Sequence, residues 1–206
     1  MNYWIWFANI KMLGSIKKQK LLEYFKTPEN IYNATKEELL EIDGIGEKIS
    51  NSIITNKDIN ALENMEKYMK KYNIKFVNIC DREYPISLKK IYDPPITLFY
   101  KGNLELLNDK CVAVVGSRNA TNYGIKTSYN IGRELSKNGY TVVSGLARGI
   151  DTYAHKGALA ANGKTIAVIA SGHDYIYPID NFMLYEEIIK RRFNTFGICC
   201  WNTTCY

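Results

Sequence analysis

The sequence contains no apolar run that approaches the roughly 20 residues needed to span a membrane. Its opening segment, MNYWIWFANIKML, is aromatic and apolar. However, no basic residue precedes the apolar run and no small-residue cleavage site follows it, as a secretory signal peptide requires. These absences argue against a membrane-spanning or secreted protein, and the sequence predicts a cytoplasmic one.

Motifs for metals and nucleotide cofactors are also missing. Of the five cysteines, Cys80 and Cys111 lie in the body of the chain and three crowd its end, with no spacing that fits a zinc knuckle or a redox pair. No G-x-G-x-x-G follows the first buried strand and no G-x-x-x-x-G-K-[ST] occurs, so NAD-dependent redox chemistry and P-loop ATP hydrolysis lose support. We expect neither a metal nor a cofactor.

The composition is that of an ordinary globular protein, with 46% hydrophobic and 23% charged residues among 206. A net charge of +6 suits a polyanionic partner without requiring one. The length fits a small domain followed by a medium one. We assign residues 1–72 to the first, residues 73–190 to the second, and residues 191–206 to a tail.

Helix signals dominate residues 1–72. Thr27 before Pro28 predicts an N-cap followed by a first-turn proline, and Thr35 with Glu38 predicts a capping box. These signals predict a small all-α domain.

Within that domain, residues 39–49 read as two short helices joined by a Gly-Ile-Gly turn. The segment resembles a helix-hairpin-helix element, whose turn presents backbone N–H groups at a helix N-terminus to a DNA phosphate. On that interpretation Gly44, Gly46 and Lys48 contact DNA. The alternative is a tight turn whose isoleucines serve only as core, and the sequence leaves both open.

Residues 73–190 repeat a cycle of strand, Gly-rich turn and helix. The continuous apolar run 111–115 is typical of a parallel strand buried on both faces. Three consecutive cycles predict right-handed crossovers and a Rossmann-like α/β fold with a doubly wound parallel sheet. The later strands are expected over residues 140–143 and 164–170, and the helices over residues 123–137 and 150–161.

In such a sheet the ligand binds beyond the carboxyl ends of the strands, where the Gly-rich turns meet. Small residues let backbone N–H groups reach an anion, and the helix dipole adds a favourable potential. Arg118 and Arg148 lie in these turns, and each guanidinium can bind a phosphate through two hydrogen bonds. Either arginine alone could instead pair with Asp151 or Asp174, but both together favour an anion site.

Two long, ordered motifs carry a family resemblance. One begins with Gly116-Ser117-Arg118, and the other, SGLARGID, begins at Ser144. The second is followed by the segment GKTIAV at residues 163–168 and by the pattern YPxxN at residues 177–181. Together they resemble the DNA-processing protein A family (DprA, also called Smf) over residues 16–190, although the helical part matches only in kind.

The resemblance implies a cytoplasmic protein that binds single-stranded DNA taken up during natural transformation and loads RecA recombinase onto it for recombination. It also implies a homodimer where the domain is complete, and no membrane contact. Tyr123 is either a stacking platform for a base or a core residue. The predicted DNA- and phosphate-binding residues are Gly116, Ser117, Arg118, Thr121, Tyr123, Gly124, Ser144, Gly145, Arg148 and Gly149.

Catalytic alternatives rest on Ser144, Asp151 and His155, which are close enough in sequence to suggest a Ser-His-Asp arrangement. Ser144 lacks the G-x-S-x-G elbow of such a nucleophile, and a histidine among alanines is typical of a hydrogen-bonded packing residue. Rossmann-like nucleotide-phosphate hydrolases share Gly-Ser-Arg but carry a later Gly-Gly-x-Gly-Thr loop, which is missing here. We therefore predict no catalytic residue, with Asp151 and His155 in supporting roles.

The tail departs from the pattern, since it shows no strand or capping signals and ends in a cysteine cluster. The family continues instead with a pattern like G-L-I-L-S-E-Y-P-x-G-T. Codons for residues 192–202, read one base later, can spell most of that pattern. We hypothesise an out-of-frame tail, a sheet incomplete at its C-terminal end and, as a further alternative, an inactive fragment; sequencing the coding DNA tests the frame.

Overall fold

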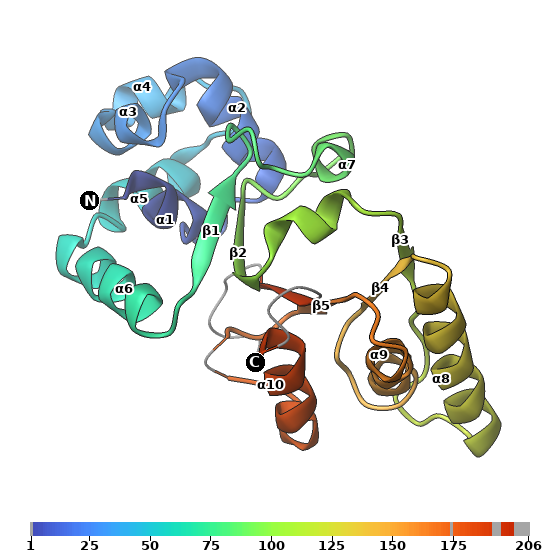
Figure 1. Cartoon of the computed structure of the whole chain (residues 1–206). Helices are drawn as coiled ribbons and strands as arrows, with labels where there is room; N and C mark the ends of the chain where they lie inside the picture. The colour runs from blue at the N-terminus through green and yellow to red at the C-terminus, as the bar shows by residue number, and fades with distance from the viewer. Residues whose placement is uncertain (1, 174, 191–194, 200–206) are drawn as a thin grey trace. The chain divides into compact units, whose positions relative to one another are not determined.

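The computed structural model describes residues 2–173, 175–190 and 195–199 (Figure 1). The chain divides into two compact units, Met1–Thr97 and Leu98–Tyr206. The domain boundary expected at residue 73 and the separate tail from residue 191 stay predictions about folding units.

The first unit is mainly helical. The Thr27 hydroxyl accepts a hydrogen bond from the Asn30 N–H at 3.2 Å, and Thr35 and Glu38 form both bonds of the predicted capping box. Both predicted helix starts are therefore confirmed. The elements of this unit are α1 (Tyr3–Ala8), α2 (Ser15–Phe25), α3 (Pro28–Asn33), α4 (Lys36–Leu40), α5 (Glu47–Thr55), α6 (Ile59–Lys71), β1 (Lys75–Asn78) and α7 (Ile86–Lys89).

The second unit contains a mainly parallel sheet with the strand order β2-β6-β5-β4-β3. The pairs β3–β4, β4–β5 and β5–β6 are parallel, whereas β2 and β6 are antiparallel. This arrangement confirms the predicted Rossmann-like α/β fold. The elements are β2 (Thr97–Gly102), η1 (Leu104–Asn108), β3 (Cys111–Ala113), α8 (Asn122–Lys137), β4 (Thr141–Ser144), α9 (Ile150–Ala160), β5 (Thr165–Ile169), η2 (Ile179–Asn181), α10 (Phe182–Lys190) and β6 (Thr195–Cys199).

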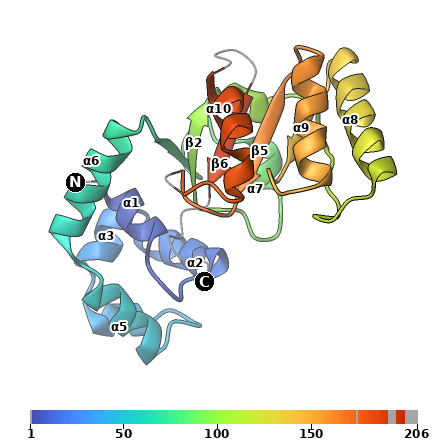
Figure 2. The same ribbon diagram turned by 90° about the horizontal axis from the view of Figure 1, so that it is seen from below.

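The helices α8, α9 and α10 lie on one face of this sheet (Figure 2). Each connects a strand to its parallel neighbour in the same direction across the sheet, and right-handed crossovers therefore place all three on the same side. The reversal of direction that defines a doubly wound sheet is not among the described crossovers. Buried side chains of α9, α10 and β5, including Leu159, Ile169 and Ile188, form the core beneath them.

Helices α8 and α9 pack closely because each presents a glycine to the other. A Cβ atom on Gly132 would overlap the Ala154 carbonyl oxygen, and one on Gly157 would overlap the Tyr129 carbonyl oxygen. This contact fixes the spacing of the two helices whose N-terminal ends carry the Gly-rich turns.

The expectation of a strand buried on both faces is wrong for β3. Cys111, Ala113 and Val115 are exposed, while Val112 and Val114 are half-buried. The reason is that β3 is the edge strand and the crossover helices cover only one face of the sheet. The apolar run therefore alternates between covered and open sides.

The expectation that the tail holds no strand is also wrong. Thr195–Cys199 forms β6, which pairs with β5 in parallel from Thr165↔Thr195 to Ile169↔Cys199. Residues 191–194 and 200–206 lie outside the described residues. The out-of-frame origin of the tail concerns the coding DNA and stays a hypothesis.

Candidate nucleic-acid interface

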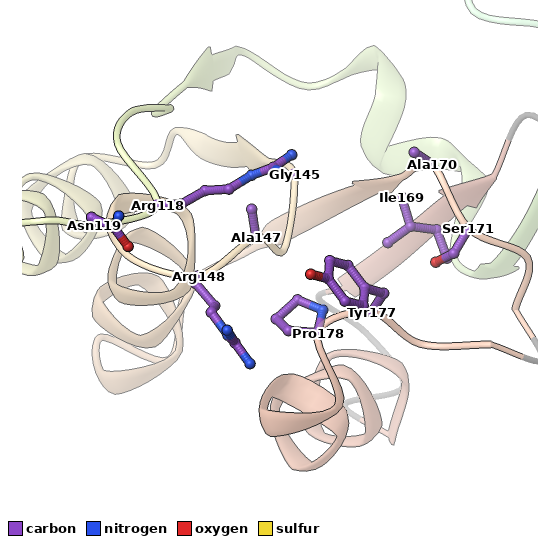
Figure 3. Close-up of a pocket in the computed structure, with 10 residues that line it drawn as sticks. All are labelled: Arg118, Asn119, Gly145, Ala147, Arg148, Ile169, Ala170, Ser171, Tyr177 and Pro178. Carbon is purple, nitrogen blue, oxygen red and sulfur yellow. The ribbon is translucent and has the colours of Figure 1, made fainter. Parts of the chain in front are cut away.

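A pocket with a volume of about 300 Å³ lies beyond the carboxyl ends of β4 and β5. This is where the topology of a Rossmann-like sheet places a ligand. Figure 3 shows the side chains around it, which come from three segments that follow β3, β4 and β5. The lining residues are Arg118, Asn119, Gly145, Ala147, Arg148, Ile169, Ala170, Ser171, Tyr177 and Pro178.

The first turn, residues 116–118, leads from β3 toward α8 and supplies Arg118. The Ser117 hydroxyl accepts a hydrogen bond from the Asn119 N–H at 3.2 Å, which tightens the chain just after the turn. Arg118 is exposed and extends toward Gly145 (Figure 3). Within the part of the chain that the structure describes, Arg118 forms no ion pair, so its guanidinium is available to an incoming anion.

The second turn, residues 145–149, is locked against the first by Gly149. This glycine has φ 78° and ψ −128°, a conformation that L side chains rarely adopt. A Cβ atom here would overlap the Ser117 carbonyl oxygen and lie 2.7 Å from that of Arg118. The Ile150 N–H also donates to the Ser117 carbonyl at 3.2 Å, so the two turns are in direct contact.

The buried Asp151 carboxylate links the same two turns through hydrogen bonds. It accepts hydrogen bonds from the Gly116 N–H at 3.3 Å and from the Gly145 N–H at 3.1 Å. The residue is only 5% exposed and lies in the first turn of α9, where the helix dipole favours negative charge. The predicted supporting role of Asp151 therefore has a geometric basis, because the carboxylate holds the rim of the pocket together.

We expect Asp151→Asn to destabilise the protein by about 1–3 kcal/mol, because an amide has one acceptor oxygen where two N–H groups need acceptors. Urea unfolding followed by circular dichroism measures this loss. An unchanged free energy of unfolding would contradict the clamp.

Arg148 differs from Arg118 because it already has an acidic partner. Its Nε and Nη2 atoms lie 3.1 and 2.8 Å from Asp180 Oδ2, and both side chains are more than half exposed. The sequence-based alternative named Asp151 or Asp174 as the partner. Asp151 faces the turns instead, and Asp174 lies outside the described residues. The partner, Asp180, lies in η2, 32 residues after Arg148. The Gly-rich motif around Arg148 therefore could not indicate this pair.

Asn181 is a supporting residue for which the sequence suggested no role. It is 5% exposed, and its Nδ2 donates to the Leu146 carbonyl and the Thr152 hydroxyl, both at 2.8 Å, and to the Ala147 carbonyl at 3.3 Å. These bonds hold the second turn, in which Leu146 has a φ of 56°. The pocket also contains Asn119, Ala170, Ser171, Tyr177 and Pro178, none of which was among the predicted binding residues.

Ser144 lies below the pocket surface, not on it. It is 2% exposed, and its hydroxyl donates to the Val114 carbonyl at 2.6 Å. The Ser144 hydroxyl is therefore engaged in linking the end of β4 to β3, and the prediction that Ser144 takes part in DNA binding stays a prediction. The other predicted members of the two turns, Gly116, Ser117, Gly145 and Gly149, lie at or beside the rim.

His155 is fully buried, and its Nδ1 pairs with the Thr165 hydroxyl at 2.7 Å. Thr165 in turn donates to the Val142 carbonyl at 2.8 Å. Since Ser144 donates to Val114 and Asp151 accepts from the two turns, the three side chains of the Ser-His-Asp alternative are engaged in separate structural contacts.

Burial lowers the pKa of His155 to about 4, with a smaller opposing effect of the Ser144 backbone. The unfolded chain binds this proton near pH 6.5, so the free energy of unfolding falls as the pH drops from about 6.5 to about 4, by up to about 3 kcal/mol. Above about pH 6.5 the ring is neutral in both states and has no such effect. Urea unfolding at about pH 7 and about pH 5 measures the loss. In His155→Asn the free energy of unfolding should differ less between these two pH values. A difference equal to that of the unaltered protein would show that other groups cause the loss.

The start of α8 shows how the remaining predicted residues are arranged. The Thr121 hydroxyl accepts from the Gly124 N–H at 3.2 Å and caps the helix, so its side chain is already engaged. Tyr123 is 80% exposed, which rules out the core role and leaves the stacking interpretation as a prediction. Gly124 packs beside Ile150, where an added Cβ would lie 3.2 Å from its Cδ1.

The helix-hairpin-helix segment of the first unit, between α4 and α5, combines a buried core with an exposed turn. Ile42, Ile45 and Ile49 are at most 8% exposed, as the structural interpretation expected. Gly44, with φ 84°, together with Gly46 and Lys48, is exposed, as contact with DNA would require. Both interpretations therefore fit the geometry.

The turn of this hairpin is braced by one ion pair. Lys20 Nζ lies 2.7 Å from Asp43 Oδ2, and this contact holds the pKa of Asp43 below its usual value. Among the described residues, no group of three or more His, Cys, Asp and Glu side chains is placed to hold a metal ion. No described helix combines the length and apolar character needed to cross a membrane.

Comparison with known families accounts for both units. The model of the family "DNA recombination-mediator protein A" matches residues 75–194, and a helix-hairpin-helix motif model matches residues 5–62. The first match covers more than half of the chain. The chain belongs to the DNA recombination-mediator protein A family.

Members of this family are similar over most of the chain. Protein Smf of Synechocystis is 36% identical over 191 residues, which are 90% of this chain and 48% of that protein. DNA processing protein DprA of Streptococcus pneumoniae is 38% identical over 169 residues, or 75% of this chain and 60% of that protein. The chain thus spans about half the length of these curated relatives.

Two solved DprA structures share the fold. The structure from Streptococcus pneumoniae superposes with a TM-score of 0.79 at 33% identity and covers 98% of this chain and 68% of its own. The structure from Helicobacter pylori, described for its single-stranded DNA binding mode, gives a TM-score of 0.52 at 29% identity over 65% of this chain and 57% of its own.

Proposed function

We propose that this chain binds single-stranded DNA in the pocket beyond β4 and β5, as a recombination mediator of the DprA type. The observation that carries the proposal is Arg118, an exposed arginine with no ion pair among the described residues, extended over a pocket of about 300 Å³. A phosphate placed there would meet a guanidinium that binds through two hydrogen bonds. The Helicobacter pylori relative, described for binding single-stranded DNA, supports this choice of ligand.

The rim is suited to a backbone contact that tolerates any sequence. Gly149 and the hydrogen bonds to Asp151 fix the two turns relative to each other, so the backbone that carries Arg118 is held in place. Phosphate contacts set position without reading bases, and aromatic rings add stacking that every base can satisfy. Tyr177, which lines the pocket and is 62% exposed, and Tyr123 are two rings suited to such stacking.

The family supports a proposal for the finer role. We propose that the protein acts in the cytoplasm on DNA taken up in natural transformation, hands it to RecA recombinase, and does so without a catalytic step of its own. The structural engagement of Ser144, Asp151 and His155 supports the last point. Homodimer formation and a second DNA contact through Gly44, Gly46 and Lys48 are part of the same proposal.

Fluorescence anisotropy with a labelled oligothymidylate tests the proposal, with a blunt duplex of matched length as competitor. We expect the single strand to bind more tightly than the duplex and its affinity to fall steeply with salt, because phosphate contacts release counterions. Folded protein that binds neither strand type at low salt would refute the proposal.

A further inference from the structure

The two arginines at the pocket stand in unlike electrostatic surroundings. Arg118 forms no ion pair with a described residue, whereas both Nε and Nη2 of Arg148 point to one oxygen of Asp180, at 3.1 and 2.8 Å. In Figure 3 the two side chains diverge from the two turns, Arg118 toward Gly145 and Arg148 on the side of Pro178. The ion pair with Asp180 therefore holds the Arg148 guanidinium, one of the two groups expected to bind phosphate, on the Pro178 side of the pocket.

Asp180 is set at this place by its neighbours. Asn181, the next residue, is buried and donates hydrogen bonds to the Leu146 and Ala147 carbonyls, which directly precede Arg148. The Asn181 N–H also donates to the Pro178 carbonyl at 3.0 Å within η2. The backbone beside Asp180 is thus hydrogen-bonded to the backbone beside Arg148. These bonds keep the two side chains of the ion pair next to each other.

We infer that Asp180 competes with the DNA phosphate for Arg148 and so holds the affinity of the pocket for single-stranded DNA below what its two arginines could give. This inference rests on the proposed function. A phosphate on Arg148 would lie beside the Asp180 carboxylate, and like charges at this range repel. The pair is more than half exposed on both sides, so it is weak enough for DNA to break. Asp180 thereby favours release of the strand, as transfer to another protein requires.

Asp180→Asn tests the inference because it removes the charge and keeps an oxygen that can accept from Arg148. Glu134→Gln is the matched control, since Glu134 is also an exposed acid paired with an arginine and a lysine. It lies near the other end of α8, about 18 Å along the helix from Asn122. Both variants change the net charge equally, so a difference between them reports the location of the charge.

We expect Asp180→Asn to tighten binding of a labelled oligothymidylate about fivefold at low salt and to steepen the salt dependence, with a change below about twofold for Glu134→Gln. In an Arg148→Ala background the gain should fall below about twofold, because the competition acts through Arg148. Equal affinities of Asp180→Asn and the control, or a gain that persists without Arg148, would overturn the inference.

Failure of the proposed function itself gives a different pattern. In that case the unaltered protein does not bind the strand, or Arg118→Ala leaves its affinity unchanged. Thermal unfolding of each variant accompanies the titrations. Because Asp180 and Glu134 are exposed, both variants should have the same unfolding temperature as the unaltered protein.

Discussion

Replacing Arg118 with alanine should weaken binding of single-stranded DNA by about 10- to 100-fold, the range expected when a charge-assisted, two-point contact to phosphate is lost. The same change at Arg148 should weaken binding less, because Asp180 already occupies its Nε and Nη2 atoms. The affinity of Arg118→Lys should lie between those of the unaltered protein and Arg118→Ala, since lysine keeps the charge but lacks the planar guanidinium. Anisotropy titrations of a labelled oligothymidylate at several salt concentrations measure the series.

Arg133→Ala is the control for this series. Arg133 lies on α8, is half-buried and pairs with Glu134, so its loss removes one positive charge away from the pocket. A purely global charge effect would weaken binding equally in Arg133→Ala and Arg118→Ala. That result would contradict the site, whereas a loss confined to Arg118 and, less strongly, to Arg148 supports it.

Gly149→Ala should destabilise the protein by about 3 kcal/mol or more, because backbone strain and steric overlap act together. The residue has φ 78° and ψ −128°, and a Cβ atom would overlap the Ser117 carbonyl oxygen. To relieve the overlap, the first and second turns must separate, which would also lengthen the hydrogen bonds from Gly116 and Gly145 to Asp151. Urea unfolding followed by circular dichroism gives the size of the loss.

Gly139→Ala provides the matched control. Gly139 also has a positive φ, of 80°, but no atom lies within 4 Å of the position its Cβ would take. It should show the conformational strain alone, about 1–2 kcal/mol. If both variants lose the same free energy of unfolding, the contact between the two turns is looser than the structure indicates.

The sequence predicted the elements that local rules determine. The capping box at Thr35 and the repeated strand, turn and helix of the second unit follow from short-range signals, and both were confirmed. The placement of Arg118 and Arg148 near one pocket also followed, because parallel strands end at one edge of a sheet. These inferences needed only neighbouring residues and topology.

What the sequence could not predict depends on contacts between distant segments. The Arg148–Asp180 pair and the bonds from Asn181 join residues 29 to 35 positions apart. Ser144 was predicted to bind DNA from its place in a Gly-rich motif, yet it ends β4 and its hydroxyl donates into β3. Whether a strand such as β3 is covered on one face or two depends on which side each crossover passes, and an apolar run does not record this.

The central claim is that the rim formed by residues 116–118 and 145–149 contacts single-stranded DNA. Photocrosslinking of the protein to a bromodeoxyuridine-containing single strand, with the attachment sites mapped by mass spectrometry, tests this contact most directly. The structure predicts attachment within the pocket, at Arg118, Asn119 or Tyr177, and its loss in Arg118→Ala. Attachment confined to the hairpin around Gly44 and Gly46, unchanged in Arg118→Ala, would contradict the claim.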